Sequence, residues 1–380
     1  MAVEADNWVF YAVELTSGEV LIDLPLVDFS GEVSLTIGTM GAKCPILDLD
    51  SAQRQAIIES TIPGRYSILA LHQGKVAGEW IIWQRSRSND LAGIDLAGSE
   101  TISLLDRRVT PTRSWMQTEQ LDIARDLILT GFGPSPKGNG AVALSFGTYS
   151  ASGQKRDRAY TLADGTIGGR LKELGAVING FDYYIQPEWV EAVGQPVKVQ
   201  RTAYLKYPRA GGDYDIMLEN ATLIDFQLTE DATSLASTCY AIGEDGLIST
   251  YEDDALITAE RLPYLEKSGS FTSVSVQATL DGHARAMWDD AQDAMLPGDL
   301  NVLANRSPGI GDWSLGDWSL GDIVTLVLDE SINFPFGLRV DVRVLGWHFQ
   351  QVSSGPETLI LNVAQEGPVG DYSGNPLAVW

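Results

Sequence analysis

The sequence is poor in the residues that most often carry enzyme chemistry. Among 380 residues there are two cysteines, Cys44 and Cys239, and three scattered histidines, His72, His283 and His348. Zinc-finger and HExxH spacings are therefore absent, and no metal or other cofactor is expected. The cysteines are far apart and belong to no CxxC pattern. One disulfide is compatible with the sequence, but two reduced, buried thiols are favoured in a protein made in the cytosol.

Long apolar runs and excess positive charge are missing as well. No run of about 18 apolar residues occurs, so no membrane-spanning segment is expected. The acidic N-terminus lacks the apolar region of a secretory signal peptide. The 26 Lys and Arg face 51 Asp and Glu, giving a net charge of −25 and a pI near 4.3. This charge repels phosphate backbones and argues against nucleic-acid binding through a basic face.

Catalytic motifs are also lacking. No GxSxG nucleophile elbow occurs, and residues 138–143 match GxGxxA only after a proline-containing loop and before an expected strand. Acidic residues are plentiful at 252–254, at 289–290 and every five residues from Asp312 to Asp322. Calcium loops of the EF-hand type place ligands every two residues, and no pair of acids stands out as a glycosidase pair. A solvated acidic surface is the favoured interpretation.

Aromatic residues are numerous, with ten tryptophans. Packing in the core and between subunits is the favoured role for them. A platform for sugar rings is the alternative for one group of five: Tyr183, Tyr184, Trp189, Tyr204 and Tyr207.

Hydrophobic periodicity predicts a mainly β protein with an α+β insert. Residues 1–110 read as short strands with glycine turns, and residues 51–62 as one helix capped by Ser51. Residues 111–190 read as a small α+β module with helices near 121–129 and 167–178. The fold class expected is two small β-barrel-like domains joined to a helical α+β module.

The second half returns to strands. Residues 197–207 alternate between apolar and polar, except that Arg201 interrupts the apolar face. Residues 191–300 are predicted to return the chain to the barrels and to contain a helix at 280–295, capped by Thr279. Residues 301–366 read as the second β-barrel-like domain and residues 367–380 as an extended arm.

Two features of the second barrel suggest a subunit contact. The pentad Gly-Asp-Trp-Ser-Leu occurs twice in succession from residue 311, which places Trp313 and Trp318 in equivalent positions. A local duplication is the simple interpretation, and a pair of interface anchors is the sharper one, because Trp is enriched at interface hot spots. In the strand 338–344, Arg339, Asp341 and Arg343 share the face opposite the apolar residues, and we predict the same interface role for them.

Several motifs, taken in order, resemble a known family. The C-terminal ones are WSLGDIVTL at 318–326, GLRV at 337–340 and ETLIL at 357–361. The N-terminal ones are GEWII at 78–82 and LDRR at 105–108, and QLDIARDLI at 120–128 with the segment 171–184 lies between. Together they resemble the tail-tip, or baseplate, hub proteins of long-tailed phages, and the hub-type minor tail proteins of actinobacterial phages in particular.

The resemblance implies a structural role in the virion, without enzymatic activity. It implies a homotrimer whose six barrels form a pseudo-sixfold ring on the tail tube or distal tail protein. Such a hub would contact the tape-measure protein above and carry a central fibre or spike below. DNA would pass through an acidic lumen without specific binding. A carbohydrate-binding tail protein for host recognition and a cell-wall hydrolase are the alternatives.

Overall fold

A computed structural model shows that the protein is mainly β, as the sequence predicts. The structure describes residues 8–72, 74–87, 93–177, 179–219, 223–228, 232–258, 263–271, 274–289, 291, 298–303, 319–350 and 358–366. Among these residues, no helix is long and apolar enough to span a membrane.

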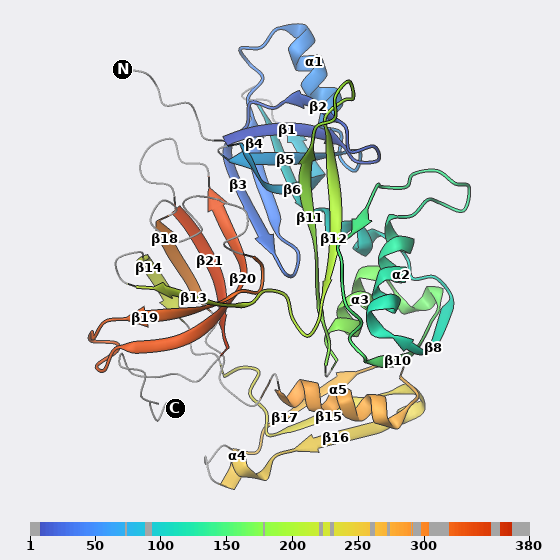
Figure 1. Ribbon diagram of the computed structural model, residues 1–380, viewed down its shortest axis with the longest axis vertical. Coiled ribbons are helices and arrows are strands. Elements are labelled where there is room, and N and C mark those ends of the chain that lie inside the picture. The colour runs from blue at the N-terminus through green and yellow to red at the C-terminus, as the bar shows by residue number, and fades with distance from the viewer. Residues whose placement is uncertain are drawn as a thin grey trace.

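The largest sheet joins strands from the N-terminal and the C-terminal parts of the chain (Figure 1). It has 13 strands, and its main path runs β14-β18-β21-β20-β3-β4-β7-β6-β5-β1-β2, with β19 on β20 and β13 on β19. Within the described residues this path stays open and closes no barrel. Its strands are β1 (Trp8–Glu14), β2 (Val20–Asp23), β3 (Val27–Ser34), β4 (Thr39–Cys44), β5 (Tyr66–His72), β6 (Lys75–Arg87), β7 (Ile94–Glu100), β13 (Asp213–Leu218), β14 (Leu223–Leu228), β18 (Gly298–Leu303), β19 (Ile323–Leu328), β20 (Leu338–Gln350) and β21 (Thr358–Gln365).

Strand β20 joins the two halves because it changes partner along its length. Its first part pairs with β19, and its last residues pair antiparallel with β3, from Gly346 opposite Ser34 to Gln350 opposite Ser30. The predicted apolar face of β20 is confirmed, since Leu338, Val340, Val342 and Val344 are all buried. One core, which contains Phe29, Trp80 and Phe349, therefore lies under both halves of the sheet.

A second core lies in the α+β module. Helices α2 (Gln120–Phe132) and α3 (Ile167–Gly175) pack with the 3-10 helix η1 (Thr101–Arg107) beside the strand pair β8 (Arg113–Glu119) and β10 (Lys155–Tyr160). A further 3-10 helix, η2 (Leu162–Asp164), lies between β10 and α3. The apolar stripe predicted for α3 is buried at Ile167, Leu171 and Leu174. Its fourth member, Ile178, lies outside the described residues.

A long hairpin separates the module from the C-terminal strands (Figure 1). It consists of β11 (Asp182–Val190) and β12 (Lys198–Lys206), paired over their full length, with the short β9 (Ser145–Phe146) parallel to β12.

A small α/β unit is inserted in the sequence between β14 and β18, two strands that pair with each other. It consists of a three-stranded sheet with α5 (Gln277–Asp289) packed on it, plus α4 (Asp254–Thr258) and the 3-10 helix η3 (Glu244–Gly246). Its strands are β15 (Thr238–Ile242), β16 (Ile248–Glu252) and β17 (Glu266–Ser270). The predicted helix at 280–295 therefore begins earlier, at Gln277 and not after a Thr279 cap. The proposed domain boundaries remain predictions, and the arm 367–380 lies outside the described residues.

The first helix also differs from its prediction at the cap. α1 (Ser51–Ser60) is capped by Asp50, whose Oδ1 accepts the Gln53 amide at 2.8 Å. Gln53 returns the contact by accepting the Asp50 amide at 3.1 Å, which completes a capping box. Asp and Ser are equally good caps, so composition alone did not distinguish the two positions.

Candidate functional site: the junction of hairpin and sheet

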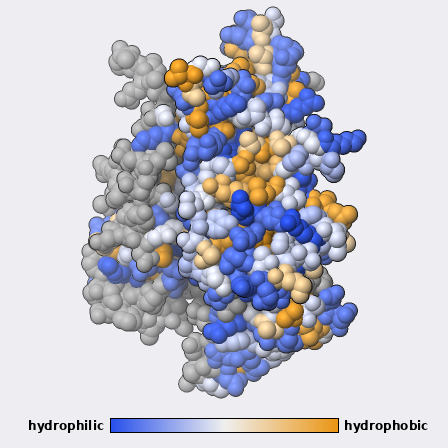
Figure 2. All heavy atoms as spheres, turned by 45° about the vertical axis from the view of Figure 1, so that its right-hand side comes forward, coloured by the Kyte–Doolittle hydropathy of each residue, from blue (hydrophilic) through white to orange (hydrophobic). Residues whose placement is uncertain are grey.

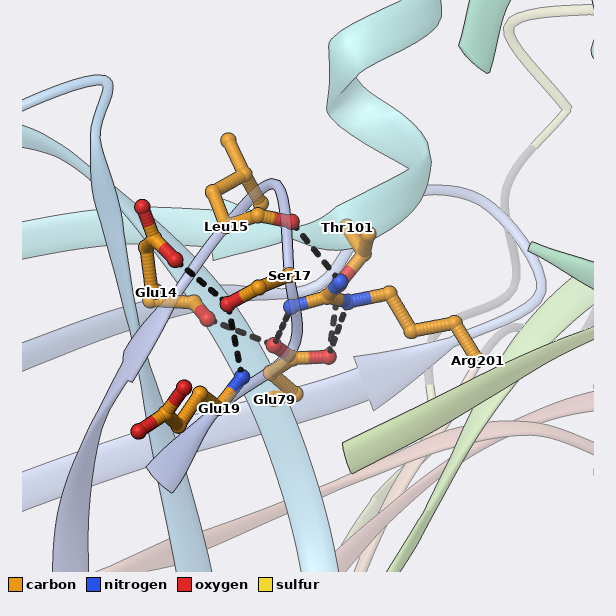
Figure 3. Close-up of polar contacts among 8 residues, drawn as sticks. Glu14, Leu15, Ser17, Glu19, Glu79, Thr101 and Arg201 are labelled. Carbon is orange, nitrogen blue, oxygen red and sulfur yellow. Dashed lines mark hydrogen bonds and ion pairs between the residues drawn. The ribbon is translucent and has the colours of Figure 1, made fainter. Parts of the chain in front are cut away.

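Arg201 is the residue that interrupts the apolar face of β12, and the structure shows why it is there. Its neighbours on that face, Val199, Ala203 and Leu205, are buried, and Arg201 itself is only 1% exposed. It reaches from the hairpin to Glu79 on β6, which is 3% exposed (Figure 3). A charge this deeply buried persists only with a partner, so the two residues must be treated as one unit.

Both Arg201 and Glu79 also form hydrogen bonds with other groups. Arg201 donates from Nε and Nη2 to the two carboxylate oxygens of Glu79 at 2.9 and 2.6 Å, and from Nη1 to the Leu15 carbonyl at 2.9 Å. Glu79 also accepts the hydroxyls of Ser67 at 2.5 Å and Thr101 at 3.2 Å. This bidentate geometry is the strong form of a carboxylate–guanidinium contact, and it fastens the hairpin to the main sheet.

The turn between β1 and β2 provides a second attachment. The Val199 amide donates to the Gly18 carbonyl at 2.7 Å, and the Val20 amide donates to the Val197 carbonyl at 3.0 Å. Gly18 has a φ of +73°, and a Cβ there would lie 2.5 Å from the Val199 oxygen. Only glycine meets both demands. Ser17 stabilises the turn by accepting the Glu19 amide and donating to Glu14 (Figure 3).

Glu100, at the end of β7, lies where the halves of the sheet meet. It accepts the Gly38 amide at 2.6 Å and the Ser34 amide at 3.3 Å. Loss of hydration raises the pKa of its carboxyl to about 8; the nearby Glu32 adds to the rise, and the two amides oppose it. Glu100 is therefore mostly uncharged at neutral pH.

The line along which β3 pairs with β20, where the two halves of the sheet meet, is called the seam below. A cavity of about 360 Å³ opens between the hairpin and this seam. This volume falls in the range of small ligand pockets. Its walls come from strands far apart in sequence, and mostly apolar groups line it beside Glu79 and Glu100. The lining residues are Val33, Gly74, Lys75, Val76, Ala77, Gly78, Glu79, Glu100, Tyr184, Ile185, Gln186, Pro187, Glu188, Trp189, Ser319, Leu320 and Trp347.

The predicted sugar platform is only partly assembled at this cavity. Tyr184 and Trp189 line it, together with Trp347 from β20. Tyr204 stacks on Tyr184 with ring centroids 5.2 Å apart, whereas Tyr183 packs against the core of the helical module. The five aromatic residues therefore do not form one continuous row.

The predicted interface residues occupy different places. Trp313 and Trp318 lie outside the described residues. Arg343 makes an ion pair with Asp182 at the start of β11 and so ties β20 to the hairpin. Asp341 accepts the Thr325 hydroxyl at 2.7 Å. Arg339 points to the Met217 sulfur at 3.8 Å. Their interface role stays a prediction.

Cys44, Cys239 and His283 are buried in the packed interior of the protein. Cys44 and Cys239 are both free and buried, and burial raises the pKa of the Cys44 thiol to about 11. His283 stacks on Phe271, and burial with two nearby arginines lowers its pKa to about 4. Across the described ranges, no group of three or more His, Cys, Asp or Glu side chains could hold a metal ion.

Comparison with known proteins gives matches among solved structures alone. No family model and no curated protein matches the sequence. The tail protein from Neisseria meningitidis MC58 superposes with a TM-score of 0.57 at 14% identity, covering 97% of this chain and 99% of its own. The 43 kDa tail protein of prophage MuSo2 from Shewanella oneidensis gives 0.57 at 11% identity, over 94% and 97%. The Francisella PdpA-VgrG complex, half-lidded, gives 0.52 at 8% identity, over 98% of this chain and 59% of the matched chain.

The chain has the fold of phage tail proteins. The two tail proteins match it over nearly the whole length of both chains. Identities this low show the fold and leave the activity to be argued. The three sources provide no support for the expected likeness to actinobacterial phages in particular.

Proposed function

We propose that this protein is a structural hub of a phage tail tip and has no enzymatic activity. The observation that carries the proposal is the match to two phage tail proteins over nearly the whole of both chains. A match over nearly the full length of both chains is more specific than a match to a single domain. The chain would act in the virion, at the tail tip.

The hub would be a homotrimer at the end of the tail tube. It would contact the distal tail protein or tube, the tape-measure protein, and a central fibre or spike. The third matched structure is a complex of VgrG with PdpA, which supports a place in a larger assembly. The continuous sheet also supports a structural role, because it unites strands from the N-terminal and the C-terminal parts of the chain.

The charge suggests how DNA would pass. Three chains of −25 give a trimer three times that charge, or −75. An acidic channel wall repels the phosphate backbone and lets the polymer slide without specific binding. A net positive lumen in the assembled hub would contradict this part of the proposal.

Electron microscopy and mass photometry of the purified chain test the hub directly. We expect a trimer with a central opening, in equilibrium with monomer at low concentration. A monomer at every concentration, both alone and with the tail-tube protein, would overturn the trimeric hub. Clearing of host cell wall by the purified chain would instead favour the hydrolase alternative, and retention on wall glycan the carbohydrate-binding one.

A further inference from the structure

The turn between β19 and β20 presents two large apolar side chains to solvent. Ile332 is 99% exposed and Phe336 is 67% exposed. The turn is nevertheless ordered by hydrogen bonds: the amides of Ser331 and Gly337 both donate to the Phe334 carbonyl at 2.9 Å. A rigid turn with exposed apolar side chains is costly in water and is typical of a contact surface.

The third large apolar residue of this turn points the other way. Phe334 packs on Phe226 of β14 with ring centroids 6.0 Å apart, and its amide donates to the Ser331 hydroxyl at 3.1 Å. Since this ring is tucked inward, the turn is fixed to its own sheet. Ile332 and Phe336 therefore project as a preformed pair, which we call the tip.

The cavity at the junction has the matching chemistry. The apolar lining of the cavity includes Val76, Ala77, Pro187, Leu320 and Trp347. Figure 2 shows one face of the molecule, where several apolar patches lie among hydrophilic residues. Each chain thus carries an apolar tip and an apolar cavity.

Charge also favours this cavity as a contact between copies. Two chains of −25 repel each other, so a contact must avoid adding like charges. Glu79 in the cavity wall is neutralised by Arg201, and Glu100 keeps its proton at neutral pH. Lys75 and Glu188, the other charged residues of the lining, have opposite charges, so the cavity wall carries no net charge against an incoming apolar group.

A tip cannot reach the cavity of its own chain. Phe336 precedes β20, and Trp347 at the cavity lies near the other end of that strand. Eleven residues separate them, and at about 3.3 Å per residue a strand of this length extends on the order of 30 Å. Tip and cavity thus lie at opposite ends of one rigid strand, and a contact between them must join two chains.

We propose that the tip of each copy inserts Ile332 and Phe336 into the junction cavity of the next copy. The contact is heterologous, because a tip meets a cavity and not another tip, and three such contacts close a ring. This inference rests on the proposed trimeric hub and assigns the surface that holds it together.

Removal of the tip tests the contact. The double variant Ile332→Ser/Phe336→Ser should raise the dissociation constant of the trimer about 30-fold or more, the effect of losing an interface hot spot. Leu162→Ser is the matched control, because Leu162 is also 67% exposed but lies on another surface. Thermal melts should show that both variants fold, since the replaced side chains are exposed.

Cross-linking tests which surfaces meet. The variant Phe336→Cys/Val76→Cys should give disulfide-linked dimers and trimers when oxidised with copper phenanthroline, and a reductant should return them to monomer. The native Cys44 and Cys239 are fully buried and do not compete. Leu162→Cys/Val76→Cys should stay monomeric on the same gel.

The outcomes separate this inference from the proposed function. A wild-type trimer that the tip variant leaves intact, with no cross-linked ladder, would overturn the tip-in-cavity contact and leave the hub standing. A wild-type protein that never trimerises would overturn both. A ladder together with loss of the trimer in the tip variant, and in that variant alone, would support both.

Discussion

Arg201 shows how one residue that breaks a pattern can mark a junction. A guanidinium on an apolar face costs free energy unless a carboxylate meets it. The carboxylate that pairs with Arg201 belongs to Glu79, which lies on another strand, 122 positions away in the sequence. The interruption was visible in the sequence, but nothing local identified the partner, because 51 acidic residues were available.

Breaking this pair should be costly. We expect Arg201→Met to lower the free energy of unfolding by about 3–5 kcal/mol, because Glu79 is left buried without its partner. The double variant Arg201→Met/Glu79→Met should recover most of the loss. Urea unfolding measures both. The exposed pair of Arg113 and Asp126 is the control, and Arg113→Met should cost less than about 1 kcal/mol.

Glu100 should make stability depend on pH. Its pKa is about 8 in the folded protein against 4.5 for the ordinary carboxyl, so folding favours the protonated form. The stability that this proton contributes is complete below 4.5, falls as the pH rises toward 8, and is gone above that. The charged or donating groups around Glu100 are Glu32 and the amides of Ser34 and Gly38.

Glu100→Gln isolates this contribution, because the amide stays neutral at every pH. We expect the unfolding free energy of the wild type to fall relative to this variant between about pH 5 and about pH 9. Parallel curves for the two proteins in urea titrations across this range would contradict the assignment.

At the scale of elements, the capping of α1 gives a direct test. Asp50 accepts the Gln53 amide, whereas Ser51 is the first residue of the helix. Asp50→Ala should cost about 1 kcal/mol, because one amide of the first turn loses its acceptor. Ser51→Ala should be close to neutral. Equal losses in denaturant unfolding would restore Ser51 as the cap.

The backbones of β20 and β3 approach closely where β20 takes β3 as its partner, which leaves little room for a side chain. Gly346 lies opposite Ser34 in the pairing with β3, and a Cβ there would lie 2.6 Å from the Val33 oxygen. Gly346→Ala should therefore destabilise the protein by about 1–3 kcal/mol through forced backbone movement. Gly41 on β4 is the matched control: nothing lies within 4 Å of its Cβ position, and Gly41→Ala should be tolerated. Thermal melts compare the two.

For the whole molecule, the net charge sets the salt dependence of assembly. Chains of −25 repel one another, and added salt screens that repulsion. We expect the dissociation constant of the trimer to fall as ionic strength rises from about 0.05 M to about 0.5 M. Mass photometry across a salt series measures it. Weaker association in high salt would show that ion pairs, and not apolar contacts, hold the subunits together.

The sequence by itself determined the class of the protein and the local elements. Alternation at 338–344 and the helical stripe from Ile167 are local, and the structure buries both as predicted. The order of motifs was also enough to indicate a tail protein. These signals survive because side-chain periodicity is fixed within a few residues by strand and helix geometry.

The tertiary structure alone decided which elements meet. β3 and β20 are more than 300 residues apart, yet they form the seam that makes one sheet of the two expected barrels. The cavity takes Tyr184 and Trp189 from one aromatic group and adds Trp347, which no spacing connects with them. Periodicity states which face of a strand is buried but not which strand lies beside it, because that choice depends on the packing of the whole chain.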